Sequence, residues 1–212
     1  MAQGPIKIDG LLDDPAWQDA PFSDDFLHFR LTVPEMPRKF GTHMKLLHDA
    51  NNLYVAFDCV DSDIWSTFTN HDDPVMFEEA VLLHLDPLGN GRDYYGIYVN
   101  PLNAVLDVKR PGGAAEMSRR RWLECIQWNG AGIEHAVHVD GTVNKRGDVD
   151  NGWTVEIRVP FDTLGVRPKP GDCWLMQAGR MKKPRMSGTV ISTWTDTRNL
   201  YLPRDFGTLL FK

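Results

Sequence analysis

Four carboxylates lie close together in the stretch NHDDPVMFEEAVLLHLDP, at positions 72, 73, 78 and 79. A glycoside hydrolase needs two such groups flanking one bond, roughly 5 Å apart for retention or roughly 6.5–9.5 Å apart for inversion. Glu78 and Glu79 are adjacent, and neighbouring side chains of an extended strand point to opposite faces of the sheet. Asp72 and Glu79 meet only if a loop brings them together, and the sequence does not specify such a loop. The pattern therefore favours a binding protein over an enzyme that uses these acids.

The same stretch also contains donor groups for a metal ion. His71, Asp72 and Asp73 supply nitrogen and oxygen donors within one loop, although their spacing matches neither an EF-hand loop nor an HExxH motif. A second cluster of oxygen donors lies around the end of a predicted strand: Asp58, Asp61 and Asp63. Hard oxygen ligands dominate both groups, so calcium is the ion that suits them best, and solvated loop acids are the ordinary alternative.

Seven histidines raise the further alternatives of zinc and haem. None of them shows a ligand spacing on a predicted helix, and His135 and His138 fall on opposite faces of a predicted strand. A haem would need two axial ligands. The conceivable pair is Met76 with Met181, Lys182 or His84. The sequence has no CxxCH attachment motif, so haem is the weakest of these alternatives.

Composition limits the class of partner. The chain has 212 residues, 23 Lys and Arg against 29 Asp and Glu, and a net charge of −6, so it lacks the basic excess that nucleic acids and anionic membranes select for. No apolar run approaches the roughly 20 residues that cross a bilayer, and the first residues do not form a secretory signal. The odd number of cysteines favours buried free thiols at Cys59, Cys125 and Cys173, with one disulfide and one free thiol as the alternative.

Alternation of apolar and polar residues with period two is the main structural signal. In WTVEIRVP, for example, Trp153, Val155, Ile157 and Val159 share one face, as in a half-buried antiparallel strand. Strands are predicted at 42–49, 53–59, 79–86, 94–100, 103–110, 122–128, 133–140, 153–159, 173–181, 189–194 and 207–212. Many short strands separated by turn residues predict one all-β domain over residues 1–212, an antiparallel β-sandwich of the jelly-roll or immunoglobulin-like kind.

One or two short helices complete the predicted fold. DDPAWQDA, residues 13–20, has Pro15 at the first helical position, after Asp13 or Asp14 as cap. FDTLG, residues 161–165, is the second candidate. Neither helix interrupts the sandwich.

Several phrases together resemble family 9 carbohydrate-binding modules. They occur in order and span nearly the whole chain: IKIDGLLDDPAW (6–17), LLHDANNLYVAFDCVDSD (46–63), EEAVLLHLDP (78–87), YYGIYVNPLN (94–103), GWTVEIRVPFDTLG (152–165) and WTDTRNLYLPRDFGTLLF (194–211). The resemblance implies an antiparallel β-sandwich that binds a sugar in a shallow cleft without catalysis. It also implies that structural calcium is common.

In well-understood members of that family, two Trp side chains sandwich a terminal sugar and polar residues on neighbouring strands bond its hydroxyl groups. Carried over to this chain, the first Trp position falls at Met76 and Phe77, and the nearest aromatic residue to the second is Tyr201. The polar partner maps to Leu82 and the charged partner to Tyr98. The resemblance therefore implies where the sugar-binding site lies, whereas the residue types at its key positions differ from those of the well-understood members.

Two arginines complete the predicted site. Arg180, on the strand CWLMQAGRM, is expected to bond sugar hydroxyls from the cleft floor beside Tyr98, or else to pair with Glu78 or Glu79. Arg204, in the loop YLPRDFG, is expected at the cleft rim with Met76, Phe77 and Tyr201. Gly96 would let a ligand approach the floor closely, unless a helix or loop covers this face.

The sequence thus predicts a non-catalytic module that recognises a saccharide or polysaccharide, with a chain end as one form of ligand. By resemblance it is expected outside the cell or in the periplasm, as part of a larger carbohydrate-active enzyme. A structural or protein-interaction module with a decayed sugar site is the main alternative, favoured by Leu82 and Tyr98. A small glycan hydrolase or lyase and a haem-binding sandwich domain are weaker alternatives.

Overall fold

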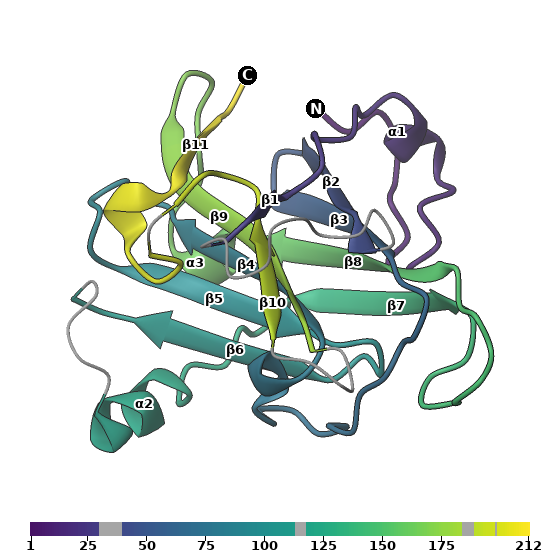
Figure 1. Cartoon of the computed structure of the whole chain (residues 1–212). Coiled ribbons are helices and arrows are strands. Elements are labelled where there is room, and N and C mark those ends of the chain that lie inside the picture. The colour runs from purple at the N-terminus through teal and green to yellow at the C-terminus, as the bar shows by residue number, and fades with distance from the viewer. Residues whose placement is uncertain (30–39, 113–117, 184–188, 198) are drawn as a thin grey trace.

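The computed structural model describes residues 1–29, 40–112, 118–183, 189–197 and 199–212. Within these residues the strands form two antiparallel sheets that pack face to face (Figure 1). The seven-stranded sheet has the order β1-β10-β9-β4-β5-β6, with β11 also paired to β9, and the four-stranded sheet has the order β2-β3-β8-β7. The predicted antiparallel β-sandwich is confirmed.

The strands are β1 (Leu27–His28), β2 (Thr42–His48), β3 (Asn52–Val60), β4 (Ala80–Asp86), β5 (Tyr94–Val99), β6 (Val105–Arg110), β7 (Glu134–Asp140), β8 (Gly152–Pro160), β9 (Cys173–Lys182), β10 (Val190–Thr193) and β11 (Gly207–Leu210). The short helices are α1 (Pro15–Gln18), α2 (Arg119–Cys125) and α3 (Phe161–Leu164), and two 3-10 turns are η2 (Val75–Phe77) and η3 (Pro203–Asp205). Pro15 opens α1 as predicted. Gly165 ends α3 in the left-handed conformation at φ 70°, which a glycine adopts without strain.

The main core lies between the two sheets. The alternating residues that the sequence assigns to one face of β3 and of β8 all point into it, as do those of β4: Leu53, Val55, Phe57 and Cys59; Trp153, Val155, Ile157 and Val159; Val81, Leu83 and Leu85. The period of two therefore determines which side chains are buried between the sheets.

The outer face of the seven-stranded sheet carries a second apolar cluster, here called the outer cluster. Its buried members are Val75, Ala80, Leu82, Tyr98, Ala104, Leu106, Val108, Cys125, Met181 and Leu200. Helix α2 contributes Cys125 to it, and the segment before η3 contributes Leu200. This face is therefore covered by other parts of the chain instead of lying open to solvent.

Residues 122–128 form part of a helix and the turn after it, and the predicted strand there is wrong. Ser118 caps α2 by accepting a hydrogen bond from the backbone N–H of Arg121. Trp122, Cys125 and Ile126 pack on the outer cluster, with the spacing i, i+3, i+4 that places side chains on one helical face. The seven residues WLECIQW are too few to distinguish the strand period of two from the helical period of about 3.6. Packing against the sheet selects the helix.

The N-terminal segment covers the outer face of the four-stranded sheet. Trp17 of α1 is fully buried there against Tyr54 and Ala56. The Glu156 carboxylate accepts hydrogen bonds from Trp17 Nε1 (2.7 Å) and from the backbone N–H of Gly10 (2.7 Å). One buried acid therefore fixes both the α1 segment and the turn before it to β8.

All three cysteines are free. Cys59 and Cys125 are buried, as expected, whereas Cys173 is exposed at the start of β9, which corrects the expectation for that thiol. Across the described residues, no helix has the length and apolar character needed to span a membrane.

Candidate functional site

The turn η2 presents one aromatic ring to solvent. Val75 is fully buried, Met76 packs partly buried on the outer cluster, and the Phe77 side chain is 66% exposed. Among the described residues, Phe77 is the most exposed aromatic residue. A single 3-10 turn therefore anchors two side chains and leaves the third, at the position matched to the first tryptophan of the resembled family, free to contact a ligand.

The two glutamates after Phe77 contact different parts of the chain, although both lie in the bend between η2 and β4 and neither is part of a strand. The Glu78 carboxylate accepts hydrogen bonds from the Thr67 N–H (2.7 Å), from Thr67 Oγ1 (2.5 Å) and from Ser66 Oγ (3.2 Å). Glu79 points inward and bonds Lys182 Nζ. Both acids make structural contacts within the protein, and they do not flank a common space.

Glu78 accepts hydrogen bonds from Ser66 and Thr67, the two residues that follow Trp65. The Trp65 indole N–H donates to the Lys183 carbonyl (2.5 Å). Trp65 was not among the residues predicted from the sequence, because a single aromatic residue in a polar loop gives no periodic signal.

Tyr201 and Arg204 lie on the loop that covers the outer cluster. The Tyr201 ring is partly buried, 5.1 Å from the guanidinium carbon of Arg110 and 6.0 Å, between ring centroids, from His84. The Arg204 side chain is 74% exposed on η3, with its Nε 3.9 Å from Asp205 Oδ1. Arg204 is thus available at the surface, whereas Tyr201 presents only part of its ring.

Met76 and Tyr201 both pack on the outer cluster, from two different segments of the chain. Phe77 lies in η2, before β4 begins, whereas the Tyr201 ring lies beside His84, in the second half of β4. The predicted aromatic residues are therefore contributed by two segments that cover the same face of the sheet.

Tyr98 does not line an open cleft. It is buried in the outer cluster with Leu82, and its hydroxyl group donates to His84 Nε2 (2.8 Å). The other ring nitrogen of His84 donates to the Leu200 carbonyl (3.1 Å), so the Leu200 loop closes this face. Above Gly96, a Cβ atom would meet Val108 Cγ2 at 3.0 Å. Protein side chains, and not a ligand, use the space that the glycine leaves.

Burial also determines the charge states of His84 and Tyr98. The pKa of His84 is lowered to about 3, first by its removal from water and then by the positive charge of Arg110. Burial raises the pKa of Tyr98 well above its usual value. The neutral tautomer of His84, with the proton on Nδ1, is therefore the state that joins Tyr98 to Leu200.

Arg180 lies on the opposite side of the sheet from Tyr98, which corrects the expectation that both form one cleft floor. Arg180 alternates with Trp174, Met176 and Ala178, which all face the main core. Its guanidinium group donates to the Val60 carbonyl (2.8 Å) and bonds the Asp61 carboxylate. Arg180 is 1% exposed, so it belongs to a buried ion-pair network.

That network also accounts for Asp61, which the sequence assigned to a calcium site. Lys182 Nζ lies 2.8 Å from Asp61 Oδ1 and 2.9 Å from Asp61 Oδ2, and it donates to the Asp63 carbonyl (2.6 Å). The ammonium group of Lys182 therefore stands where a cation between Asp61 and Asp63 would lie. Asp58 lies on β3, where burial raises its pKa. The three acids do not form a common metal site.

A hollow at one end of the sandwich is too small for the main site. It has a volume of about 120 Å³, below the roughly 300–1,000 Å³ of typical ligand pockets. Its lining includes Asp93, Tyr95 and Lys109. The surface around Phe77 is therefore the better candidate for ligand binding.

Comparisons with known proteins agree with this architecture. A carbohydrate-binding module of family 9 from Caldicellulosiruptor kristjanssonii, solved with cellotriose, is 16% identical with a TM-score of 0.68, over 99% of this chain and 90% of that one. A family 9 carbohydrate-binding module from Caldicellulosiruptor kristjanssonii that was solved with glucose is 15% identical with a TM-score of 0.68, over 100% of this chain and 93% of that one. A Bacteroides uniformis ATCC 8492 protein to which carbohydrate binding is attributed is 13% identical with a TM-score of 0.71, over 100% and 96%.

At these identities the solved structures establish the fold. A search among curated proteins gives no match. The model of one family, described as carbohydrate family 9 binding domain-like, matches residues 8–212. This agrees with the expectation of a binding module in place of an enzyme, and the chain belongs to the carbohydrate family 9 binding domain-like family.

Proposed function

We propose that this chain binds a saccharide through the surface around Phe77, without catalysing a reaction. The observation that carries the proposal is the exposed Phe77 ring, held in solvent by η2 in a chain whose family is defined by carbohydrate binding. The C–H faces of a pyranose pack well on an aromatic ring, and Met76 offers a polarizable surface beside it. Phe77 is the proposed principal contact.

Arg204 and the exposed part of Tyr201 are the proposed second contact. They belong to the segment at residues 200–205, which covers the same face of the sheet as Met76. The exposed guanidinium group of Arg204 offers several N–H donors to adjacent hydroxyl groups. The relatives solved with glucose and with cellotriose motivate a comparison of one glucose with a chain of three.

The buried floor favours a second candidate function. Leu82 and Tyr98 fill the outer cluster where the resembled family has polar partners, so few hydrogen bonds remain for a sugar from β4 and β5. On this alternative the module contacts another protein through Phe77. Secretion and a place within a larger polysaccharide-degrading enzyme belong to the same proposal as saccharide binding.

Replacing Phe77 by alanine is expected to weaken cello-oligosaccharide binding about 5–30-fold, because the change removes about 1–2 kcal/mol of ring contact. Isothermal titration with glucose, cellotriose and a wider panel of oligosaccharides checks this result. Phe77 is largely exposed, so the folded state should be retained.

Phe22→Ala is the matched control. Phe22 is also an exposed phenylalanine, but it lies against His43 of β2, on the other sheet. Binding that is equal in wild type, Phe77→Ala and Tyr201→Ala would exclude this site. The absence of any saccharide binding at millimolar concentration would support the interaction module instead.

A further inference from the structure

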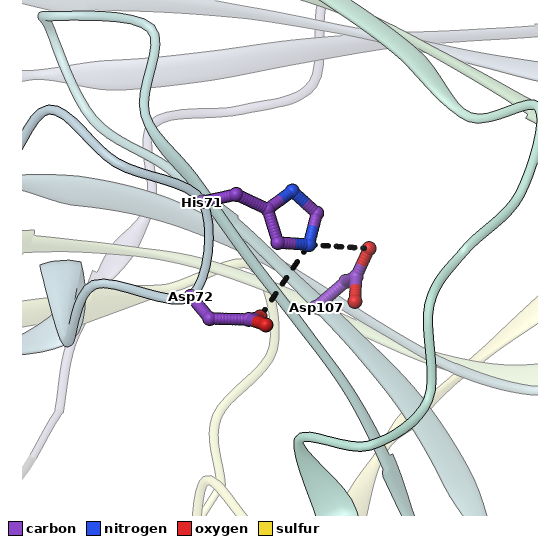
Figure 2. A group of neighbouring side chains, drawn as sticks. All are labelled: His71, Asp72 and Asp107. Atoms are coloured by element: carbon purple, nitrogen blue, oxygen red, sulfur yellow. Dashed lines mark ion pairs between the residues drawn. The ribbon is translucent and has the colours of Figure 1, made fainter.

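Three potential metal ligands from two distant parts of the sequence meet at the edge strand β6 (Figure 2). His71 Nε2 lies 3.5 Å from Asp72 Oδ1 and 3.8 Å from Asp107 Oδ2. The three donor atoms all lie within 4.8 Å of one another. Both distances exceed a normal hydrogen bond, so the imidazole does not itself satisfy either carboxylate.

Backbone pairing brings these residues together. The Asp72 N–H donates to the Val105 carbonyl (2.9 Å) at the start of β6, and Asp107 is two residues further on the same face of that strand. Asp73 is not part of the group, because its carboxylate accepts from the backbone N–H groups of Thr69 (3.1 Å) and Asn70 (2.8 Å). Asp107 therefore takes the place that the sequence analysis gave to Asp73.

Asp107 is a buried acid that lacks a cationic partner of its own. Its side chain is 5% exposed, and no Lys or Arg of the described residues pairs with it. Gly130 N–H donates to Oδ2 (3.1 Å), but Oδ1 is buried without a hydrogen-bond partner in the described part of the chain. An ionised carboxylate is costly in this position unless a cation compensates it.

A second buried carboxylate oxygen near His71 also lacks a hydrogen-bond partner among the described residues. Asp72 Oδ1, the atom that faces His71, is also buried without a hydrogen-bond partner within the described residues. The site remains accessible, because the side chains of His71 and Asp72 are 46% and 36% exposed. One imidazole nitrogen and one oxygen of each carboxylate thus lie within 4.8 Å of one another, beside side chains that solvent reaches.

We propose that His71, Asp72 and Asp107 bind one divalent transition-metal ion, Zn²⁺ in the first place, with water in the fourth position. Ligands about 2.0–2.2 Å from a tetrahedral zinc ion lie roughly 3.3–3.6 Å from each other, close to the distances of 3.5 Å and 3.8 Å from His71 Nε2 to the two carboxylates. One imidazole and two carboxylates suit zinc better than calcium, which takes oxygen ligands in larger number. The Gly130 N–H holds Asp107 in place from outside the ligand set.

The ion would join the loop that precedes η2 to the edge of the seven-stranded sheet. His71 and Asp72 are only a few residues before Phe77, and Asp107 is part of β6. A bound metal ion therefore stabilises the folded state over the unfolded chain, in which the two segments are apart. This inference does not depend on saccharide binding.

The test is thermal unfolding of the tag-free chain, stripped with a chelator and then titrated with Zn²⁺. At a free concentration about 100-fold above the dissociation constant, Zn²⁺ is expected to raise the unfolding midpoint by about 5–10 °C. Titration calorimetry without any sugar should give one site per chain. His71→Ala and Asp107→Asn are each expected to weaken Zn²⁺ binding at least about 100-fold, since even residues that only support a ligand contribute 10–100-fold.

His43→Ala is the matched control, because His43 Nε2 lies 3.8 Å from Asp25 Oδ1 in a histidine–aspartate pair outside the proposed site. It should bind Zn²⁺ as wild type does. His71 is half-exposed, so the His71→Ala variant is expected to fold. Its Zn²⁺ affinity tests the proposal even if Asp107→Asn does not fold. The proposal is overturned by the absence of a Zn²⁺ shift in wild type, by an equal shift in His71→Ala, or by a larger shift with Ca²⁺ than with Zn²⁺.

Discussion

Asp61→Ala is expected to lower the free energy of unfolding by about 3–5 kcal/mol, the cost of breaking a buried ion pair by removing one partner. Asp61 is fully buried and binds both Arg180 and Lys182. After the change, two buried cations share the single carboxylate of Glu79, which bonds Lys182 and lies 3.9 Å from Arg180. Chemical denaturation of both proteins at pH 7 measures the difference.

Asp162→Ala is the control for this experiment. Asp162 also pairs with an arginine, Arg167, at 2.7 Å, but its side chain is 81% exposed. A solvated pair of this kind contributes about 0–1 kcal/mol. A loss below about 1 kcal/mol in Asp61→Ala would contradict the buried network. Adding Lys182→Met to Asp61→Ala should recover part of the loss, because it restores the balance of one cation with one acid.

Acid should destabilise the protein through His84. The folded-state pKa is about 3 and the unfolded value about 6.5, so below pH 6.5 the unfolded chain takes up a proton that the folded chain does not. Stability is therefore complete above pH 6.5, falls as the pH is lowered, and reaches its full loss near pH 3. At 1.36 kcal/mol for each unit, His84 accounts for a loss of about 2 kcal/mol between pH 6.5 and pH 5.

The comparison of wild type with His84→Gln isolates this effect, because the other acids titrate in both proteins. Denaturation curves at pH 6.5 and pH 5 should show a loss that is about 2 kcal/mol smaller in the variant, whatever its absolute stability. Equal losses in the two proteins would show that His84 takes up a proton as readily in the folded state as in the unfolded chain. Saccharide binding is not needed for this measurement.

Local pattern predicted most of the fold. The alternation of β3, β4 and β8 identified both the strands and the side chains between the sheets. The local pattern failed at α2, because its few residues fit both the strand period and the helical period. The contact with the outer cluster selects the helix. The two-residue strand β1 gave no periodic signal at all.

The structure leaves some of the predicted site residues at the surface and buries others. The sequence brought attention to Phe77, which the structure places in solvent, and to Arg204, which it leaves exposed. It misplaced Arg180, although the alternation with Trp174 and Met176 already indicated the inner face. A long basic side chain can face solvent or a buried acid, and local sequence does not show that Asp61 lies beside it.

The sequence by itself determined the sandwich, the residues of its main core and the family, because each depends on strand period and order along the chain. Only the tertiary structure decided that Tyr98 is covered, that Lys182 and Arg180 bind Asp61, and that Asp107 joins His71 and Asp72. Those contacts join residues far apart in the chain. Their geometry follows from sheet packing and strand register, which a local pattern does not contain.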